Sequence, residues 1–492
     1  MDQLRGPVDA DLAETHLSIV VGVGDRVYKL KKPVRFDFVD QSTREQRERL
    51  CHQEVDRNRR LAPDVYLGVA DVAGPDGEQC DHLVVMRRMP RDRRLSTLVI
   101  GGDERVRPAL DQLATQLSRF HRMAARSPEI TAAAAPSALY ALWKANAEEM
   151  RPFEGSVFPV GQLDGTLGRA DRCLRGREAL FARRAADGWI CDGHGDLLAD
   201  DVFVLDDGPR ALDCLDFDPR LAYGDVATDV AFLAMDLERL GAPELAAHWL
   251  STYQRASGAT IPATLLHLYV AYRAQVRAKV TALRSDQEAD HHSATAARDL
   301  LQLCDRHLRR ATPRLVLVGG TPGTGKSTVA RDLHEHFGWR VIRSDVVRKG
   351  DPAPTVGGSG RWREGAYSPA ATERTYAALL AAAEESLAGG DDVVLDASFA
   401  DAGHRAAARR FADQVSAEVL ELRCTLEPAE RDRRIARRLR EGTDVSEADA
   451  GIAARLSAAA DPWPEATDLP TDASPSAVAE KVVALVEQWI RG

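Results

Sequence analysis

Hydrophobic and polar positions at the beginning of the chain follow the two-residue alternation of β-strands. Four stretches read as short strands: residues 17–23, 26–32, 65–72 and 83–89. Gly24 and Asp25 form a turn between the first two, and residues 43–61 read as a polar helix between the two pairs. We therefore expect a β-rich region with one helix at this end of the chain.

The middle of the chain is dominated by helical periodicity. Residues 104–186 carry an apolar face at helical spacing, formed by Leu110, Leu113, Leu117 and Phe120. Strand patterns return at 188–218, and helices then dominate from 225 to about 310, where glycine and proline are sparse. This part therefore reads as a mostly helical region that one strand-containing segment interrupts.

Strands and helices alternate in the last part of the chain, which is typical of a parallel sheet covered by helices. Pro313 ends a helix directly before an apolar run at residues 314–319. We therefore predict two domains, residues 1–308 and 314–492, joined by a linker at 309–313.

Size and composition agree with a multidomain globular protein. A chain of 492 residues is too long for one core, and its 44% hydrophobic and 28% charged residues are ordinary for such proteins. The formal net charge of −10 argues against non-specific nucleic-acid binding as the main role. The chain begins without a signal-peptide pattern and has no apolar run of membrane-spanning length, so we expect a cytoplasmic protein without a membrane partner.

Cysteines are spread through the chain, at positions 51, 80, 173, 191, 214, 304 and 424. Their odd number and the lack of a C-x-x-C pair support neither a disulfide framework nor a zinc site. We expect a reduced protein in which Cys191 and Cys214 are buried as small hydrophobic side chains.

The strongest chemical signal is a run that matches the phosphate-binding pattern G-x-x-x-x-G-K-[ST] at every fixed position. The loop and the residue after it are Gly320, Thr321, Pro322, Gly323, Thr324, Gly325, Lys326, Ser327 and Thr328. A strand pattern precedes the loop and a helical pattern follows it, which is the context that the motif needs. Backbone N–H groups and the positive end of the helix would surround phosphates, Lys326 would reach the β- and γ-phosphates, and Ser327 would bind Mg²⁺. We therefore expect ATP and Mg²⁺ as cofactors.

Two carboxylates follow strand patterns after this loop. Asp345 ends the strand-like run 339–345, where a base can take the proton of an incoming hydroxyl; an N-cap of the next helix is the alternative. Asp396 ends the buried run 393–396, where it can hold Mg²⁺, contact the acceptor or serve as an ordinary strand-end acid.

Residues 314–490 resemble the small P-loop kinases, including the polynucleotide kinase and zeta-toxin groups. The resemblance implies that Asp345 is the catalytic base and that Arg348 helps to place the acceptor. The basic and aromatic segment 357–367 suits a mobile acceptor loop or a plain surface loop.

The resemblance also places a lid at residues 429–440. This stretch contains Arg431, Arg433, Arg434, Arg437, Arg438 and Arg440. Arg434 and either Arg437 or Arg438 share one face of the expected helix, from which they would stabilise charge on the transferred phosphoryl group. A solvated helix without a special role is the alternative.

A second set of acidic motifs lies in the first domain. His194 and Asp196 belong to an H-G-D sequence between two strand patterns, and Asp216 lies 20 residues after Asp196 in a second acidic strand. A phosphotransferase needs one carboxylate near the acceptor hydroxyl and others on the metal ions. We therefore expect Asp196 to act as a base, Asp216 to bind Mg²⁺ and His194 to support the loop.

With Lys29 on an early strand and Glu54 on the following helix, residues 10–300 resemble the aminoglycoside phosphotransferase and choline kinase family, which shares the protein-kinase-like fold. The resemblance implies that Lys29 holds the α- and β-phosphates and that Glu54 orients Lys29. Lys31 is the alternative to Lys29, because both point to the same face of the strand.

The chain departs from the family pattern H-G-D-L-x-x-x-N, because Asp201 stands at the position of the asparagine. Aspartate is a competent Mg²⁺ ligand, so Asp201 stays a candidate metal ligand, and a degenerate domain is the alternative. Gly22 and Gly24 are the glycines near the first turn, which makes a sparse glycine-rich loop.

Together these observations predict an α/β and α+β two-domain protein, with an N-terminal protein-kinase-like bilobal domain and a C-terminal P-loop NTPase fold on a parallel sheet. The predicted function is an ATP-dependent phosphotransferase, bifunctional if both sites act, that transfers the γ-phosphate to the hydroxyl of a small molecule. The alternatives are a nucleotide-dependent switch with a degenerate N-terminal lobe and a toxin-like kinase of nucleotide sugars. The sequence names neither the acceptor nor an oligomeric state.

Overall fold

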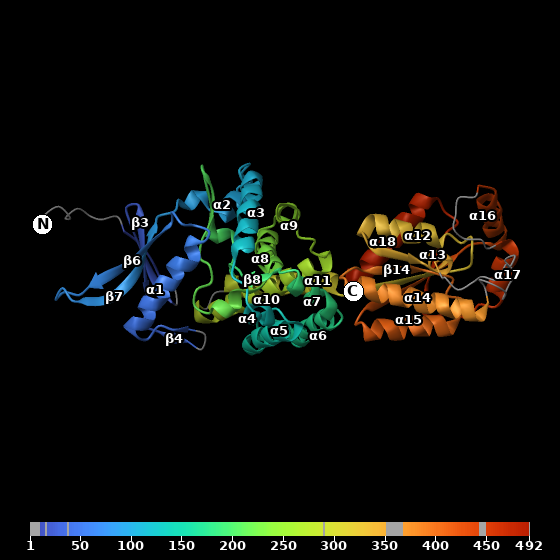
Figure 1. The fold of residues 1–492 in the computed structure, drawn as a ribbon, viewed down its shortest axis with the longest axis horizontal. Coiled ribbons are helices and arrows are strands. Elements are labelled where there is room, and N and C mark those ends of the chain that lie inside the picture. Colours follow the sequence, from blue (N-terminus) through green and yellow to red (C-terminus); the bar gives the residue numbers. More distant parts are fainter. Residues whose placement is uncertain are drawn as a thin grey trace. The chain divides into compact units, whose positions relative to one another are not determined.

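The computed structural model describes residues 10–14, 17–36, 39–288, 291–350, 368–441 and 449–491. The chain divides into two compact units (Figure 1). The first unit contains Met1–Phe158, Ala182–Ile261 and Tyr269–Cys304. The second unit contains Pro159–Phe181, Pro262–Leu268 and Asp305–Gly492. The unit that carries the phosphate loop therefore also gathers two short segments from earlier in the chain.

The first unit begins with an antiparallel sheet in the order β1-β2-β3-β7-β6. Its strands are β1 (Ala10–Glu14), β2 (Ser18–Val23), β3 (Arg26–Lys31), β6 (Tyr66–Ala73) and β7 (Gln79–Arg87). Helix α1 (Arg44–Arg59) packs on β6 and β7 through Cys51 and Val55. A capping box begins this helix, because Thr43 and Gln46 each accept a hydrogen bond from the other's backbone N–H. The four strands and the helix expected here are confirmed, and β1 is an additional strand.

Helices follow this sheet, as the spacing of apolar residues predicts. They are α2 (Leu95–Ile100), α3 (Val106–Met123), α4 (Pro128–Ala133), α5 (Pro136–Met150), α6 (Gln162–Arg175), α7 (Glu178–Ala186), α8 (Val226–Arg239), α9 (Pro243–Ser257), α10 (Ala263–Glu288) and α11 (His291–Ala311). Short antiparallel pairs are β4 (Arg35–Phe36) with β5 (Val39–Asp40), β8 (Ile190–Asp192) with β11 (Tyr223–Asp225), and β9 (Val202–Leu205) with β10 (Gly208–Ala211). An antiparallel sheet with one helix, followed by a helical region, is the bilobal protein-kinase-like arrangement that was expected.

Helix α8 is buried over most of its length. Every residue from Val226 to Leu237 is buried, including the acids Asp229 and Asp236. Buried carboxylates need hydrogen-bond partners, so these two acids are positioned to hold neighbouring backbone in place.

The second unit is built on a sheet of parallel strands in the order β13-β14-β12-β15-β16. The strands are β12 (Arg314–Gly319), β13 (Arg340–Arg343), β14 (Val393–Asp396), β15 (Glu418–Thr425) and β16 (Thr467–Pro470). Helix α6 belongs to this unit, and the helices that follow β12 are α12 (Lys326–Phe337), α13 (Ser344–Lys349), α14 (Pro369–Ala388), α15 (Ala402–Gln414), α16 (Pro428–Glu441), α17 (Ala450–Ala458) and α18 (Pro475–Arg491). The P-loop fold on a parallel sheet is therefore confirmed.

The central strand β12 is buried on both faces. Leu315 and Leu317 point into a core formed with α14 and α15, whereas Val316 and Val318 point into a core formed with α12 and α18. An uninterrupted apolar strand is what a parallel sheet with helices on both sides requires. This rigid strand places the phosphate loop at its carboxyl end.

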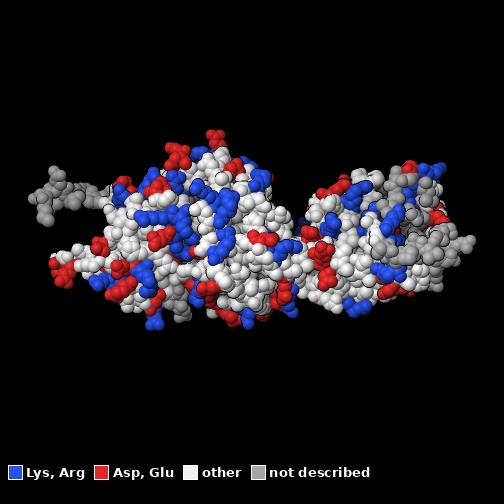
Figure 2. Space-filling model, in the orientation of Figure 1, with Lys and Arg blue, Asp and Glu red and all other residues white. Residues whose placement is uncertain are grey.

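The cysteines and the surface charges of the protein agree only partly with its overall composition. Each of the seven cysteines, all within the described ranges, is a thiol, and Cys191 and Cys214 are buried as predicted. In the described part of the chain, no helix is long and apolar enough to cross a membrane. On the face drawn in Figure 2, Lys and Arg side chains gather on the first unit although the whole chain is acidic, so charge is spread unevenly.

Candidate functional site

The phosphate loop follows β12 and adopts a conformation that its glycines require. Gly320, Gly323 and Gly325 have φ angles of +133°, +86° and +90°, which favour glycine. A Cβ atom at Gly320 would lie 2.6 Å from the carbonyl oxygen of Cys424, and one at Gly323 would lie 2.7 Å from Cγ1 of Ile435. The tight loop therefore excludes side chains at these positions and lets the backbone curl around an anion.

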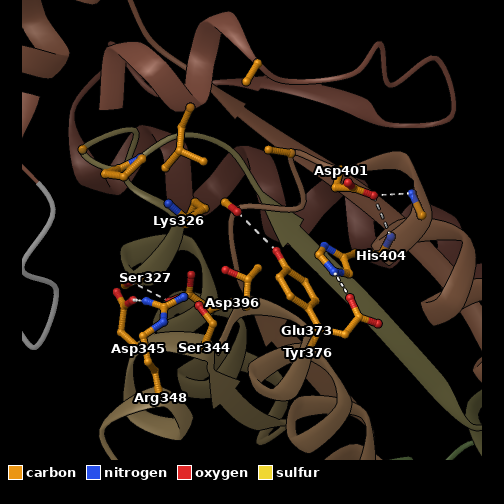
Figure 3. Close-up of a pocket in the computed structure, with 18 of the residues that line it drawn as sticks. Lys326, Ser327, Ser344, Asp345, Arg348, Glu373, Tyr376, Asp396, Asp401 and His404 are labelled. Atoms are coloured by element: carbon orange, nitrogen blue, oxygen red, sulfur yellow. Dashed lines mark hydrogen bonds and ion pairs between the residues drawn. The ribbon is translucent and has the colours of Figure 1, made fainter. Parts of the chain in front are cut away.

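Lys326 and Ser327 begin α12 directly after the loop (Figure 3). The Nζ atom of Lys326 donates a hydrogen bond to the carbonyl oxygen of Thr321 at 3.1 Å. The Oγ atom of Ser327 donates to Oδ2 of Asp396 at 2.6 Å. Asp396 ends β14 and is buried. The two residues predicted to bind metal therefore meet, and a hydroxyl beside a carboxylate is the oxygen donor set that Mg²⁺ takes together with phosphate oxygens.

Arg343 joins this pair, which no sequence motif indicated. It ends β13, and its Nε donates to Oδ2 of Asp396 at 3.2 Å while its Nη2 donates to Oγ of Ser327 at 3.0 Å. The parallel register of β13 and β14 pairs Arg343 with Asp396, which explains the contact. The two residues are 53 positions apart in the sequence, so their contact could not be predicted without knowing the order of the strands.

The loop opens into a pocket of about 650 Å³. It gathers most of the residues predicted for this site, namely Pro322, Gly323, Gly325, Lys326, Ser327, Thr328, Asp345, Arg348, Asp396 and Arg434. Asp345 lies in the first turn of α13 and accepts a hydrogen bond from Nη1 of Arg348 at 2.8 Å (Figure 3). The N-cap of α13 is Arg343, without a side-chain cap, so the alternative in which Asp345 caps the helix is wrong.

Further polar side chains line the same pocket (Figure 3). The ring of Tyr376 stacks on His404 with ring centroids 3.9 Å apart, and its hydroxyl lies 3.2 Å from Oγ of Ser398. Nε2 of His404 lies 3.0 Å from Oε2 of Glu373, and Asp401 caps the start of α15. Sequence reasoning missed this group, because its members come from α14, α15 and the loop after β14 and form no motif.

Helix α16 directs its arginines to two places. Arg434 and Arg438 line the pocket, and Nη2 of Arg434 donates to the carbonyl oxygen of Thr471 at 2.9 Å. Both also line a neighbouring hollow of about 730 Å³ between α12, β13 and α16, whereas Arg437 lines this hollow and not the pocket. Of the two expected partners of Arg434, the structure therefore brings Arg438 into the pocket. The expected acceptor segment 357–367 lies outside the described residues.

In the first unit, two lysines share one buried acid. Nζ of Lys29 lies 2.8 Å from Oε1 of Glu54, and Nζ of Lys31 lies 2.7 Å from Oε2 of Glu54. Lys29 also lies 3.3 Å from Oδ1 of Asp213, whereas Lys31 lies 2.9 Å from Oδ2 of Asp216. Burial opposes ionisation of Glu54, but the two ammonium groups outweigh it and keep the pKa of Glu54 below its usual range. The expected Lys29–Glu54 pair is present, and Lys31 contacts the acid expected to bind metal.

Buried side chains hold the H-G-D loop in place through hydrogen bonds. Nδ1 of His194 accepts from the backbone N–H of Asp196 at 3.3 Å, so Nε2 donates to the carbonyl oxygen of Leu212 at 3.1 Å. Burial lowers the pKa of His194 to about 4, which keeps the ring neutral. The carboxylate of Asp229 accepts from the backbone N–H groups of His194 and Gly195 at 2.6 and 2.9 Å. His194 thus supports the loop as expected, and Asp229 is a second support that sequence reasoning missed.

The carboxyl groups around this loop influence one another. Burial, opposed by Arg277 and assisted by Asp213, raises the pKa of Asp196 to about 6. Burial also raises the pKa of Asp201, and the charges of Asp213 and Asp196 add to the rise. Among the residues that the structure describes, no three His, Cys, Asp or Glu side chains group as a metal site. Metal binding by Asp201 and Asp216 therefore stays a prediction.

Comparisons with known proteins add a relative and a family. Residues 315–462 match the family described as AAA domain. The chain is 42% identical over 456 residues to the uncharacterised protein Rv2004c of Mycobacterium tuberculosis, which covers 92% of this chain and 90% of that protein. A choline/ethanolamine kinase family protein of Mesorhizobium loti is 13% identical with a TM-score of 0.40, over 62% of this chain and 90% of that chain. The APS kinase of Mycobacterium tuberculosis is 24% identical with a TM-score of 0.28, over 36% of this chain and 98% of that chain.

Proposed function

The chain belongs to the family of the uncharacterised mycobacterial protein Rv2004c, and we propose that it is an ATP-dependent phosphotransferase that transfers the γ-phosphate to a hydroxyl group of a small molecule. The observation that carries the proposal is the meeting of Ser327 with Asp396 in a pocket that also contains Asp345. A phosphate loop by itself supports a nucleotide-dependent switch equally well. A carboxylate in the same pocket supports transfer to an acceptor, because it can take the acceptor's proton.

In the proposed reaction, the acceptor hydroxyl lies beside Asp345. The carboxylate of Asp345 takes the hydroxyl proton while the acceptor oxygen bonds to the γ-phosphorus, and the bond from that phosphorus to the β–γ bridging oxygen breaks to release ADP. Arg348 holds the carboxylate in place at 2.8 Å, and Lys326 supplies positive charge to the phosphates. Ser327 and Asp396 would hold a divalent ion, which would polarise the phosphate oxygens when bound.

The dimensions and polarity of the pocket support a small acceptor. Its volume of about 650 Å³ suits a small molecule. Glu373, Tyr376 and His404 supply groups that form hydrogen bonds with hydroxyl or amino substituents. Arg434 is placed in the same pocket, where it would stabilise charge on the transferred group.

The first unit supports a second phosphotransfer site with Asp196 as its base. The Lys29–Glu54 pair on the same unit as the H-G-D loop is the strongest support. Lys31 contacts Asp216, the acid expected to bind Mg²⁺. This contact favours a second candidate function, in which the first unit binds a ligand and regulates the protein without phosphotransfer. The two candidates differ in whether phosphotransfer by this unit requires Asp196.

Transfer of labelled phosphate tests the proposal. Protein is incubated with γ-labelled ATP and a panel of aminoglycosides, amino sugars, nucleosides and polyols, of which we expect one class to be labelled. Asp345→Asn should lower the rate by about 10²–10⁴-fold, because the amide keeps the shape of the carboxylate but cannot take a proton. The affinity for ATP should stay unchanged. Asp391→Asn, at an exposed acid before β14, is the matched control and should keep the wild-type rate.

Two outcomes contradict parts of this proposal. Labelling at the wild-type rate by Asp345→Asn shows that Asp345 is not the base. A wild-type protein that binds and slowly hydrolyses ATP, but labels no acceptor of the panel, supports the switch instead.

A further inference from the structure

Arg343 contacts the two side chains that the proposed function assigns to the divalent ion. Its Nε lies 3.2 Å from Oδ2 of Asp396, and its Nη2 lies 3.0 Å from Oγ of Ser327. These two oxygens are themselves 2.6 Å apart, so the three groups close a triangle. A cation of the protein therefore already holds the oxygens that Mg²⁺ would need.

Burial explains why a cation is needed there. Asp396 is only 4% exposed, and a buried carboxylate without a counter-charge is costly. The register of the parallel strands β13 and β14 sets Arg343 opposite Asp396, so the fold itself supplies the counter-charge. The side chain of Arg343 is 26% exposed, so it is not locked into the core.

The hollow next to Arg343 favours the same contact. Arg343 lines this hollow together with Arg331, Arg340, Arg434, Arg437 and Arg438. Among the residues that line the hollow, Glu441 is the acid that can offset these positive charges. Guanidinium groups repel one another, so Arg343 is better placed on Asp396 than in the hollow until an anion arrives.

We propose that Arg343 is a positioning residue that serves as the counter-cation of the nucleotide-free site and competes with the divalent ion for Ser327 and Asp396. The inference rests on the proposed function, because it needs these residues to bind metal with the nucleotide. Bound phosphates bring the negative charge that allows the guanidinium to leave the carboxylate. The metal concentration that the site needs is then set partly by Arg343.

Binding of Mn²⁺ without turnover tests this inference. Mn²⁺ is titrated into the full-length protein with a non-hydrolysable ATP analogue, and unbound Mn²⁺ is followed by electron paramagnetic resonance. Arg343→Ala should bind Mn²⁺ about tenfold more tightly, the factor that corresponds to the loss of one competing charge-assisted hydrogen bond. Lys481→Ala, at an exposed lysine of α18, is the control and should bind as the wild type does. Unchanged or weaker binding by Arg343→Ala overturns the inference.

Thermal melting is a second readout, which does not depend on catalysis. Without nucleotide and metal, Arg343→Ala should melt at a lower temperature than the wild type. Addition of Mn²⁺ and the analogue should raise the melting temperature of Arg343→Ala by more than it raises that of the wild type. Arg343→Gln can still form a hydrogen bond with Asp396 but carries no charge. It should therefore remain folded even if the alanine variant does not, and it should bind Mn²⁺ more tightly than the wild type. A glutamine variant with wild-type Mn²⁺ affinity contradicts the competition.

Failure of the proposed function is distinguishable from failure of this inference. A wild-type protein that shows no nucleotide-dependent Mn²⁺ binding refutes both. Normal wild-type binding with unshifted Arg343 variants refutes the role of Arg343 alone.

Discussion

Both candidate sites place a cation of the protein on an acid that was expected to bind metal. Arg343 contacts Asp396 in the second unit, and Lys31 contacts Asp216 in the first. Each cation lies on a strand, and each acid is shielded enough to need a counter-charge. A divalent ion at either acid would compete with this cation, so we expect Arg343 and Lys31 to influence how much metal each site needs.

Asp196 gives a pH-dependent prediction. Burial raises its pKa from 3.8 to about 6, so the carboxyl group is half protonated near pH 6. A base must be ionised to accept a proton, so phosphotransfer by the first unit should decrease as the pH falls, with a midpoint near 6 instead of near 4. The measurement is the rate against pH in a Lys326→Ala background, which silences the second unit. A rate that stays constant down to about pH 5 contradicts this role of Asp196.

Among the elements, the phosphate loop and helix α16 fit closely. Ile435 of α16 is buried and would lie 2.7 Å from a Cβ atom at Gly323. Arg434 and Arg438, on either side of Ile435 in sequence, line the pocket, whereas Arg433 is exposed and pairs with an acid of its own helix. The loop therefore sets how closely the helix approaches, and the helical spacing decides which arginines line the pocket.

Gly323→Ala and Gly338→Ala separate the effect of backbone conformation from that of close packing. Both glycines have positive φ, +86° and +73°, so alanine should cost about 1–2 kcal/mol at either position. A new Cβ atom would clash with Ile435 at Gly323, whereas nothing lies within 4 Å at Gly338. We expect Gly323→Ala to lower the free energy of unfolding by about 1–3 kcal/mol more than Gly338→Ala and to weaken ATP binding. Denaturant unfolding and ATP titration measure both effects, and equal losses contradict the close fit.

For the whole molecule, the notable feature is one candidate nucleotide site in each compact unit. The first unit contains the Lys29–Glu54 pair and the H-G-D loop, and the second contains the phosphate loop. Since the sites use different residues, removing one should leave the other in place. The contribution of each site to the number of nucleotides bound per chain can therefore be measured with variants of that site.

Lys326→Ala should halve the number of ATP molecules bound per chain, from two to one, because it removes the ammonium group of the phosphate loop alone. Equilibrium dialysis with labelled ATP measures the stoichiometry. Lys481→Ala, at an exposed lysine of α18, is the control and should still bind two. Asp196→Ala should then remove any phosphotransfer that survives Lys326→Ala. If Lys326→Ala binds no ATP at all, the first unit is not a nucleotide site.

Local features of this protein follow from the sequence by itself. The phosphate loop is a continuous motif, so its place between a buried strand and a helix could be predicted without knowing the fold. The apolar run of β12 predicted a buried strand, and the H-G-D motif predicted a loop supported by His194. Each of these features depends on the order of residues within one short stretch, which propensity and periodicity determine.

Only the tertiary structure decided which side chains meet. Arg343 reaches Asp396 through strand register, and Lys31 reaches Asp216 across 185 positions of the chain. The stacking of Tyr376 on His404 likewise joins two helices. Periodicity states which face of an element is buried, but strand order, register and helix placement depend on packing of the whole core. The contacts of Arg343 with Asp396 and of Lys31 with Asp216 therefore could not be predicted from sequence.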